Sequence, residues 1–133
     1  MADRPQPLFG APGWPEHLTF APAVRVGDVV YLSGTTGADD EGRIAEGDMA
    51  EQARQIFRKF DRILAPLGAS CRDIVSTTDY VVTTRDYKKT AAVRREFFGA
   101  TLPASTGVVV AGLVRPHALI EISAIAVLPE GAR

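Results

Sequence analysis

Cysteine is almost absent from this chain, and neither sign of charge dominates it. Cys71 is the single cysteine among 133 residues, so the chain forms no internal disulfide and lacks the thiol set of a zinc site. The 15 basic and 16 acidic residues give a formal net charge of -1, which offers no global basic surface for nucleic acid. Apolar runs fall far short of the roughly 20 residues that span a bilayer, and no secretion signal is recognisable. We therefore expect a cytoplasmic protein with no nucleic-acid or membrane partner.

Composition and length favour one compact domain. Hydrophobic residues make up 46% of the chain and charged residues 23%, a mixture typical of globular proteins, and a chain of this size holds one domain. Five of the nine prolines lie within the first 22 residues, where their fixed φ and missing N–H groups favour extended chain. We predict a proline-rich arm over residues 1–17 and a single domain over 18–133.

The spacing of apolar residues predicts the elements of this domain. Gly27-Asp28 separates two short β-rich runs and indicates a tight hairpin. Apolar residues spaced three and four apart predict a helix with Asp48 as N-cap and Gly68 as its stop. The predicted strands lie near 23–26, 29–34, 74–83, 104–111 and 118–128, and a second helix covers 86–98. This β-β-α-β-α-β-β order predicts an α+β sandwich with both helices on one face of a mixed sheet.

The last predicted strand has two unlike faces. Alternate side chains from Ile120 to Leu128 point one way and form the core under the helices, because side chains alternate along a strand. The opposite face is also largely apolar, yet it holds the carboxylate of Glu121. One layer of helices leaves this face uncovered, and such a face is typical of a protein–protein contact. We therefore predict a homo-oligomer.

Several segments together resemble a known family. Residues 20–34 read Phe-Ala-Pro-Ala-Val-Arg-Val-Gly-Asp-Val-Val-Tyr-Leu-Ser-Gly, and residues 120–127 read Ile-Glu-Ile-Ser-Ala-Ile-Ala-Val. With Asp73-Ile-Val-Ser-Thr-Thr, Phe97-Phe98 and Pro103-Ala104, they resemble the RidA/YjgF family of reactive-intermediate deaminases over about residues 18–128. The resemblance implies a chorismate-mutase-like fold and a homotrimer with a central barrel, in which three clefts lie between subunits.

The resemblance also implies a chemistry. Members of the family hydrolyse enamines and imines in these clefts without a metal or an organic cofactor. The matching residues here are Ser33 and Gly34 after the first long strand, and Glu121 in the last strand. A carboxyl group in a partly apolar cleft can protonate carbon or nitrogen and orient a water. We predict Glu121 as the proton-handling group and the Ser33 hydroxyl as a ligand of substrate or water.

This chain departs from the family pattern at the substrate-binding positions. Deaminating members place an arginine after the Pro-Ala dipeptide, where its planar fork clamps a carboxylate, and Ser105 stands at that position here. A tyrosine is replaced by Phe20, an amide by Ala91, and a cysteine by Gly107. Phe20 keeps the ring and loses the hydroxyl, whereas Ser105, Gly107 and Ala91 vacate volume, which favours a larger and less charged ligand than a 2-imino carboxylate. The predicted substrate contacts from these matches are Phe20, Gly34, Ala91, Ser105, Thr106 and Gly107.

Three further residues are candidate contacts with alternatives left open. Arg115, before the last strand, either reaches a ligand anion or is a solvated loop arginine, and His117 is either an acid–base group or a surface histidine. Asp79, within a β-rich run, either pairs with a nearby arginine or hydroxyl or is a second carboxylate of the cleft. Basic residues of the second helix are predicted to form a solvated face: Lys88, Lys89, Arg94 and Arg95.

We therefore expect a cofactor-independent enamine or imine deaminase that acts on a reactive small molecule in a cleft between subunits. Two alternatives remain open at this stage. One is an isomerase, dehydratase or cyclase that acts on a neutral or bulky metabolite, because proton transfer does not require a carboxylate clamp. The other is a non-catalytic, ligand-binding or chaperone-like trimer, which the loss of polar cleft residues favours.

Overall fold

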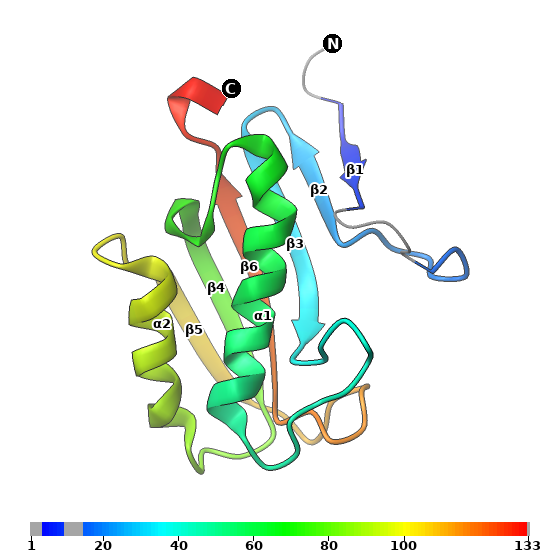
Figure 1. Cartoon of the computed structure of the whole chain (residues 1–133), viewed down its shortest axis with the longest axis vertical. Helices are drawn as coiled ribbons and strands as arrows, with labels where there is room; N and C mark the ends of the chain where they lie inside the picture. Colours follow the sequence, from blue (N-terminus) through cyan, green and yellow to red (C-terminus); the bar gives the residue numbers. More distant parts are fainter. Residues whose placement is uncertain (1–3, 10–14, 133) are drawn as a thin grey trace.

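The computed structural model describes residues 4–9 and 15–132, whose strands form one mixed sheet with two helices on one face (Figure 1). The strand order is β1-β2-β3-β6-β4-β5, and β4 and β5 are the one parallel pair among these strands. The strands are β1 (Gln6–Leu8), β2 (Ala23–Val26), β3 (Val29–Thr36), β4 (Ile74–Val81), β5 (Ala104–Val109) and β6 (Ile120–Val127), and the helices are α1 (Met49–Leu64) and α2 (Thr90–Phe98). The predicted α+β architecture is confirmed.

The predicted N-terminal arm contributes an additional strand. Within residues 1–17, β1 pairs antiparallel with β2, so that Gln6 lies opposite Arg25 and Leu8 opposite Ala23. Pro7 is tolerated there because β1 is an edge strand, where a missing N–H need not interrupt a ladder. Residues 1–3 and 10–14 of the predicted arm lie outside the described residues.

The β2–β3 hairpin leads into a bulge in β3. Gly27 has a φ of 60° and opens the two-residue turn between paired Val26 and Val29, a conformation that glycine adopts without strain. Further along β3, the ladder with β6 passes from Leu32 opposite Ala124 to Thr35 opposite Ile122. Three steps on β3 therefore match two on β6. This β-bulge contains Ser33 and Gly34 and turns their side of the strand toward the loops.

Helix α1 supplies most of the core. Asp48 accepts a hydrogen bond from the backbone N–H of Glu51 at 3.0 Å, as an N-cap does. The apolar stripe, including Ile56, Phe57 and Phe60, is fully buried in one cluster with the inward side chains of β6. The α-helix ends at Leu64, and a 3₁₀ turn over Ala65–Leu67 leads to Gly68 at a left-handed φ of 74°.

Helix α2 begins later than the sequence predicts. Asp86, the expected start, has a φ of 66°, which an α-helix does not accommodate. The chain then makes a 3₁₀ turn over Tyr87–Lys89 before α2 begins at Thr90. The side chain of Phe98 at the end of α2 is fully buried, with its ring centroid 5.1 Å from that of Phe57 in an edge-to-face arrangement. This contact fixes α2 beside α1 over the sheet.

The two faces of β6 differ as predicted. Ile120, Ile122, Ala124 and Ala126 are buried beneath the helices, whereas the intervening side chains from Glu121 to Val127 are half-buried on the other face. Figure 1 shows that both helices lie on the same side of the sheet, so among the described residues no helix covers the second face. In the described part of the chain, no helix is long and apolar enough to cross a bilayer.

Candidate functional site

A pocket of about 450 Å³ lies where the β3 bulge meets the loop before β6. Five of the residues predicted from the sequence line it: Phe20, Ser33, Gly34, Arg115 and Glu121. Much of the remaining wall is apolar and comes from the N-terminal segment, from α1 and from the loop before β6, through residues such as Leu18, Phe60, Ile63 and Val114. We call this site the Glu121 pocket.

Glu121 lies at the junction of two hollows. It lines the Glu121 pocket and also a neighbouring hollow of about 340 Å³ on the uncovered sheet face, together with Tyr80 and Ser123. Within residues 4–9 and 15–132, no group forms a hydrogen bond or an ion pair with its side chain. A half-buried carboxylate without a protein partner is free to exchange a proton with a ligand or a water.

The β3 bulge holds Ser33 and Gly34 against this carboxylate. A Cβ atom at position 34 would lie 2.6 Å from Oε2 of Glu121, so glycine is needed for the present position of the carboxylate. The Ser33 hydroxyl donates to the carbonyl of Ala21 at 2.7 Å. Because a hydroxyl has one proton and two lone pairs, the Ser33 oxygen can still accept a hydrogen bond from a bound molecule.

The loop that carries Arg115 is fixed by a buried amide. The Gln52 side chain, fully buried in α1, donates to the carbonyls of Ala45 (2.9 Å) and His117 (3.2 Å) and accepts from the N–H of Leu119 at 2.8 Å. Arg115 is half-buried, lines the Glu121 pocket and donates to the carbonyl of Gly42. The structure therefore places this arginine in the pocket lining, and its contact with a ligand anion stays a prediction.

His117 lies outside the Glu121 pocket. Its Nδ1 is 2.7 Å from Oε1 of Glu46, and both side chains are largely exposed. Its backbone has a φ of 66°, which directs the chain from the loop toward β6. The structure therefore places His117 on the surface, as in the second alternative for this residue.

Lys59 lines the Glu121 pocket and was not singled out from the sequence. Its Nζ donates to the carbonyl of Thr36 at 2.5 Å and to Oγ1 of Thr35 at 3.2 Å. Burial and, secondarily, the positive charge of Arg115 lower the pKa of Lys59 to about 8. Lys59 lies three residues after Ile56 and four before Ile63, beside the apolar stripe of α1. That spacing is the signal from which a pocket position could have been suspected.

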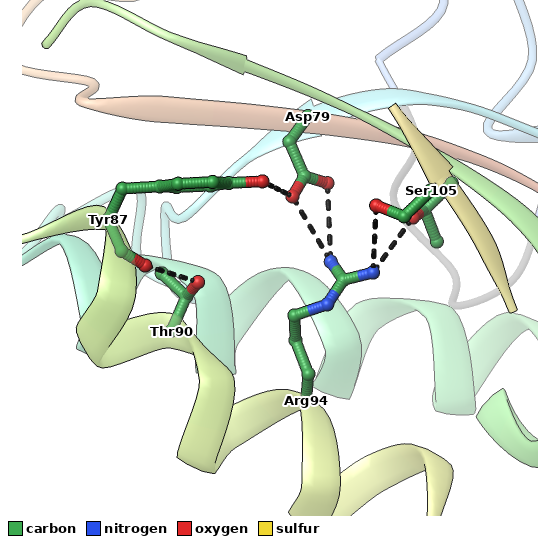
Figure 2. Close-up of polar contacts among 6 residues, drawn as sticks. Asp79, Tyr87, Thr90, Arg94 and Ser105 are labelled. Atoms are coloured by element: carbon green, nitrogen blue, oxygen red, sulfur yellow. Dashed lines mark hydrogen bonds and ion pairs between the residues drawn. The ribbon is translucent and has the colours of Figure 1, made fainter. Parts of the chain in front are cut away.

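Asp79 belongs to a separate polar cluster beneath α2 (Figure 2). Its side chain is fully buried, accepts a hydrogen bond from the Tyr87 hydroxyl at 2.6 Å and pairs with the Arg94 guanidinium at 3.1 Å. Arg94 also donates to Thr77 and Ser105 at 3.0 and 3.1 Å. We call these five residues the Asp79 cluster. Of the two alternatives for Asp79, the structure shows the pairing with an arginine and a hydroxyl.

The prediction that the basic residues of the second helix form a solvated face is wrong for Arg94. Arg94 has only 18% of its side chain exposed, because Asp79 lies within its reach and its guanidinium carbon is 5.2 Å from the Phe98 ring centroid. Lys88 and Lys89 are exposed, in agreement with the prediction. Tyr87 completes the cluster, and burial together with its bond to Asp79 raises the pKa of the Tyr87 hydroxyl to about 12.

The space expected around Ser105 and Gly107 is filled by this cluster. A Cβ atom at Gly107 would lie 2.9 Å from the Tyr87 hydroxyl, and Arg94 reaches Ser105. Thr106 is exposed on edge strand β5, and Ala91 is half-buried in α2. None of these four positions lines the Glu121 pocket of the same chain. The inference that small residues leave room for a larger ligand therefore does not hold within one subunit.

A comparison with known protein families shows to which family this chain belongs. A sequence model described as Endoribonuclease L-PSP matches residues 15–128. The chain belongs to this family, the RidA/YjgF family. The 3-aminoacrylate deaminase RutC of Acinetobacter baylyi is 32% identical over 92% of this chain and 98% of its own length. A 2-iminobutanoate/2-iminopropanoate deaminase of mouse is 31% identical over 81% of this chain and 80% of its own length.

Solved structures agree with this membership. A Mycobacterium tuberculosis member of the YjgF/YER057c/UK114 family matches with a TM-score of 0.77 and 29% identity, over 93% of this chain and 99% of that one. The predicted chorismate-mutase-like fold is therefore confirmed. In this RidA/YjgF member, no arginine follows Pro103-Ala104, but the guanidinium of Arg94 reaches the serine there from α2. That guanidinium is already paired with Asp79.

Proposed function

We propose that this protein is a cofactor-independent deaminase that hydrolyses a small reactive imine or enamine to a carbonyl compound and ammonia. The observation that carries the proposal is the carboxylate of Glu121, which has no side-chain partner among residues 4–9 and 15–132, lies against Gly34 and lines one pocket with Ser33. Two relatives are named as deaminases, one of 3-aminoacrylate and one of 2-iminobutanoate and 2-iminopropanoate. Both substrate types can be hydrolysed by one carboxylate, because an enamine protonated on carbon becomes an iminium ion with a C=N group.

The proposed reaction uses Glu121 first as base and then as acid. It takes a proton from a water whose oxygen attacks the imine carbon, and it returns that proton to the nitrogen of the resulting carbinolamine. The carbinolamine hydroxyl then gives its proton to Glu121, which passes it to the nitrogen as the C–N bond breaks, so that the overall change is imine plus water to carbonyl compound plus ammonia. With an enamine, Glu121 starts as the protonated acid and gives its proton to carbon, which leaves an iminium ion and the carboxylate that then acts as base on the water. The Ser33 oxygen accepts a hydrogen bond from the water or from the substrate nitrogen.

The proposed active site lies between subunits of a homotrimer. The half-apolar sheet face and the outer edge of β5 lack a covering layer within residues 4–9 and 15–132, and Tyr31, Val108 and Val109 are exposed there. Burying such a surface against a second copy is favourable. In this assembly, Ala91, Ser105, Thr106 and Gly107 would belong to the wall that a neighbouring subunit adds to the Glu121 pocket. Sedimentation at micromolar concentration tests the assembly, and a lone protomer would contradict it.

The replacement Glu121→Gln tests the catalytic assignment, since it removes the titratable group at nearly constant shape. We expect kcat for 2-iminobutanoate, generated in situ by an amino-acid oxidase and followed by ammonium release, to fall about 10²- to 10⁴-fold. The matched control is Glu41→Gln, because Glu41 is exposed and pairs with Arg43 on the surface. Unchanged turnover by a folded Glu121→Gln oligomer would remove the proposal. Absence of turnover by the wild-type protein would favour the isomerase or ligand-binding alternatives.

A further inference from the structure

Two cationic side chains, Lys59 and Arg115, line the Glu121 pocket and form no ion pair with any described carboxylate. Lys59 donates to two oxygens of β3, the Thr36 carbonyl and the Thr35 hydroxyl, and Arg115 donates to the Gly42 carbonyl. In the described part of the chain, neither side chain has an acidic oxygen within ion-pair distance. Arg62 pairs with Asp40 and Arg43 with Glu41, whereas the pocket lining holds two cationic side chains and one carboxylate, that of Glu121.

The two carboxylates that raise the pKa of Lys59, Asp40 and Asp39, already have other partners. The Asp40 carboxylate pairs with Arg62 at 2.5 Å, and Asp39 accepts from the backbone N–H groups of Glu41 and Arg43 at 2.9 Å each. Asp40 and Asp39 raise the pKa of Lys59 by less than burial and the charge of Arg115 lower it. The pocket therefore holds two neighbouring positive groups in partly apolar surroundings, and such an arrangement is stabilised by an anion.

The hydrogen bonds of Lys59 are those of a lysine that is positioned to bind a ligand, and differ from those of a solvated surface lysine. An ammonium group has three N–H donors, and two of them are used by the two oxygens at the end of β3. These bonds fix Nζ beside the pocket, and the third donor remains for a bound group. A carboxylate has two oxygens with about four acceptor sites, enough to accept from Lys59 and Arg115 together.

We propose that Lys59, assisted by Arg115, binds the anionic group of the substrate in the Glu121 pocket and so determines its specificity. The substrate class follows from the lining: a small imine or enamine with a carboxylate directed to these cations and a carbon chain against Phe60 and Ile63. The proposal rests on the proposed function only for the statement that the substrate carries an imine or enamine group. Anion binding itself depends on the charges. Arg94 cannot take this role, because Asp79 already neutralises it.

The kinetic test compares an anionic substrate with a neutral one of the same shape. Lys59→Met removes the charge, Lys59→Arg keeps it, and Lys88→Met is the matched control because Lys88 is exposed and lies outside the pocket. We expect Lys59→Met to raise KM for 2-iminobutanoate about 10- to 100-fold, the loss of one charge-assisted hydrogen bond. KM for 2-iminobutanamide stays unchanged, and Lys59→Arg restores most of the affinity for the carboxylate. Equal effects on both substrates would overturn the proposal.

Anion binding can also be measured without turnover. Calorimetry with 2-oxobutanoate, the product anion, and 2-oxobutanamide measures the charge preference even if no imine is turned over. We expect the wild-type protein to prefer the anion at least tenfold, and Lys59→Met to lose this preference. If the preference persists in Lys59→Met, the role of Lys59 is refuted whatever the outcome of the Glu121→Gln assay. Absence of turnover with an intact preference refutes the deaminase function and supports the anion site.

The pH dependence of binding adds a third measurement. The groups that act on the Lys59 charge are Arg115 and Arg62, which lower its pKa, and Asp40 and Asp39, which raise it, and Glu121 lies in the same pocket. Above about pH 8 free Lys59 loses its proton, so binding an anion requires proton uptake. The Kd of 2-oxobutanoate then rises up to about tenfold per pH unit. Lys59→Arg, which stays charged, should give a flat profile, and the same slope in both proteins would contradict the proposal.

Discussion

The Asp79 cluster and the Glu121 pocket place similar groups in opposite circumstances. Both contain a carboxylate on one of two paired strands, and Asp79 of β4 lies opposite Ile122, the neighbour of Glu121 at the start of β6. Asp79 faces the helices, is fully buried and has a hydroxyl and a guanidinium as partners. Glu121 faces the uncovered side and has no side-chain partner in the described part of the chain.

This difference shows how one sheet separates structure from chemistry. A buried carboxylate must be paired, because an isolated charge in the core is strongly unfavourable. Pairing fixes it and removes its capacity to act on a ligand. A carboxylate on a half-open face can still act on a ligand, because water that enters the neighbouring hollow can solvate its charge. The cations follow the same rule, since Arg94 is neutralised by Asp79 whereas Lys59 and Arg115 have no carboxylate among the described residues.

The strongest test of the comparison is Asp79→Ala. It leaves Arg94 as an unpaired, largely buried cation and Tyr87 without its acceptor. We expect the free energy of unfolding to fall by about 3 to 5 kcal/mol, as for other broken buried pairs, measured by urea denaturation. The control Glu41→Ala breaks an exposed pair with Arg43 and should change stability by less than about 1 kcal/mol. Similar losses in both variants would mean that the Asp79 cluster is not a structural core.

The replacement Gly34→Ala tests the pocket in the same way. The added Cβ would meet Oε2 of Glu121 at 2.6 Å, and the flexible carboxylate would move aside rather than unfold the strand. We expect kcat/KM for 2-iminobutanoate to fall about 100-fold, as when a catalytic group is misplaced by about 1 Å. The free energy of unfolding should change by less than about 1 kcal/mol. Full activity of this variant would show that the exact position of Glu121 does not matter. Gly131→Ala is the control, because a Cβ there has open space around it and Gly131 lines neither hollow beside Glu121.

A smaller effect is expected from Tyr87→Phe. The variant removes the 2.6 Å hydrogen bond to Asp79 and keeps the ring. Hydrogen bonds to charged groups contribute about 1.5 to 3 kcal/mol, so we expect a loss of about 2 kcal/mol in stability and unchanged KM for the substrate. Tyr31→Phe is the control, since the Tyr31 hydroxyl has no hydrogen bond among the described residues. Because Ser105 of the Asp79 cluster belongs to the proposed neighbouring wall, a raised KM in Tyr87→Phe would show that the Tyr87–Asp79 bond also positions that wall for the ligand.

Local signals in the sequence predicted most of the fold. The Asp48 cap, the apolar stripe of α1, the Gly27 turn and the alternation of β6 each act over a few residues, and the structure contains all of them. Strand β1 was not predicted, because its pairing with β2 depends on contacts across 15 or more residues and its prolines conceal a strand pattern. The start of α2 was misplaced, because the left-handed φ of Asp86 has no strong sequence signature.

The candidate site was predicted in part. Ser33, Gly34 and Glu121 were found from their resemblance to the family, and the structure brings them together with Phe20 and Arg115. Lys59 was missed, because a lysine beside an apolar stripe has the same local pattern in a pocket as in solvent. Its environment is set by two oxygens of β3, at least 23 residues away in sequence. Arg94 was misassigned for the same reason, since its partner Asp79 lies on another element.

The smallest expected effect is a difference in the pH dependence of stability. Lys59 titrates near pH 10.5 in the unfolded chain and near 8 in the folded protein. Between these values the unfolded state binds more protons, so the free energy of unfolding contributed by this residue rises with pH. Lys59→Met should lack this rise, which solvent screening at a half-buried site limits to about 1 kcal/mol. Urea midpoints measured from pH 7 to 10.5 give the difference, and Lys88→Met should keep the wild-type slope. If the urea midpoints of wild type and Lys59→Met change with pH in parallel, Lys59 is solvated like a surface lysine. The Glu121 pocket would then not differ from the Asp79 cluster by holding an unneutralised lysine.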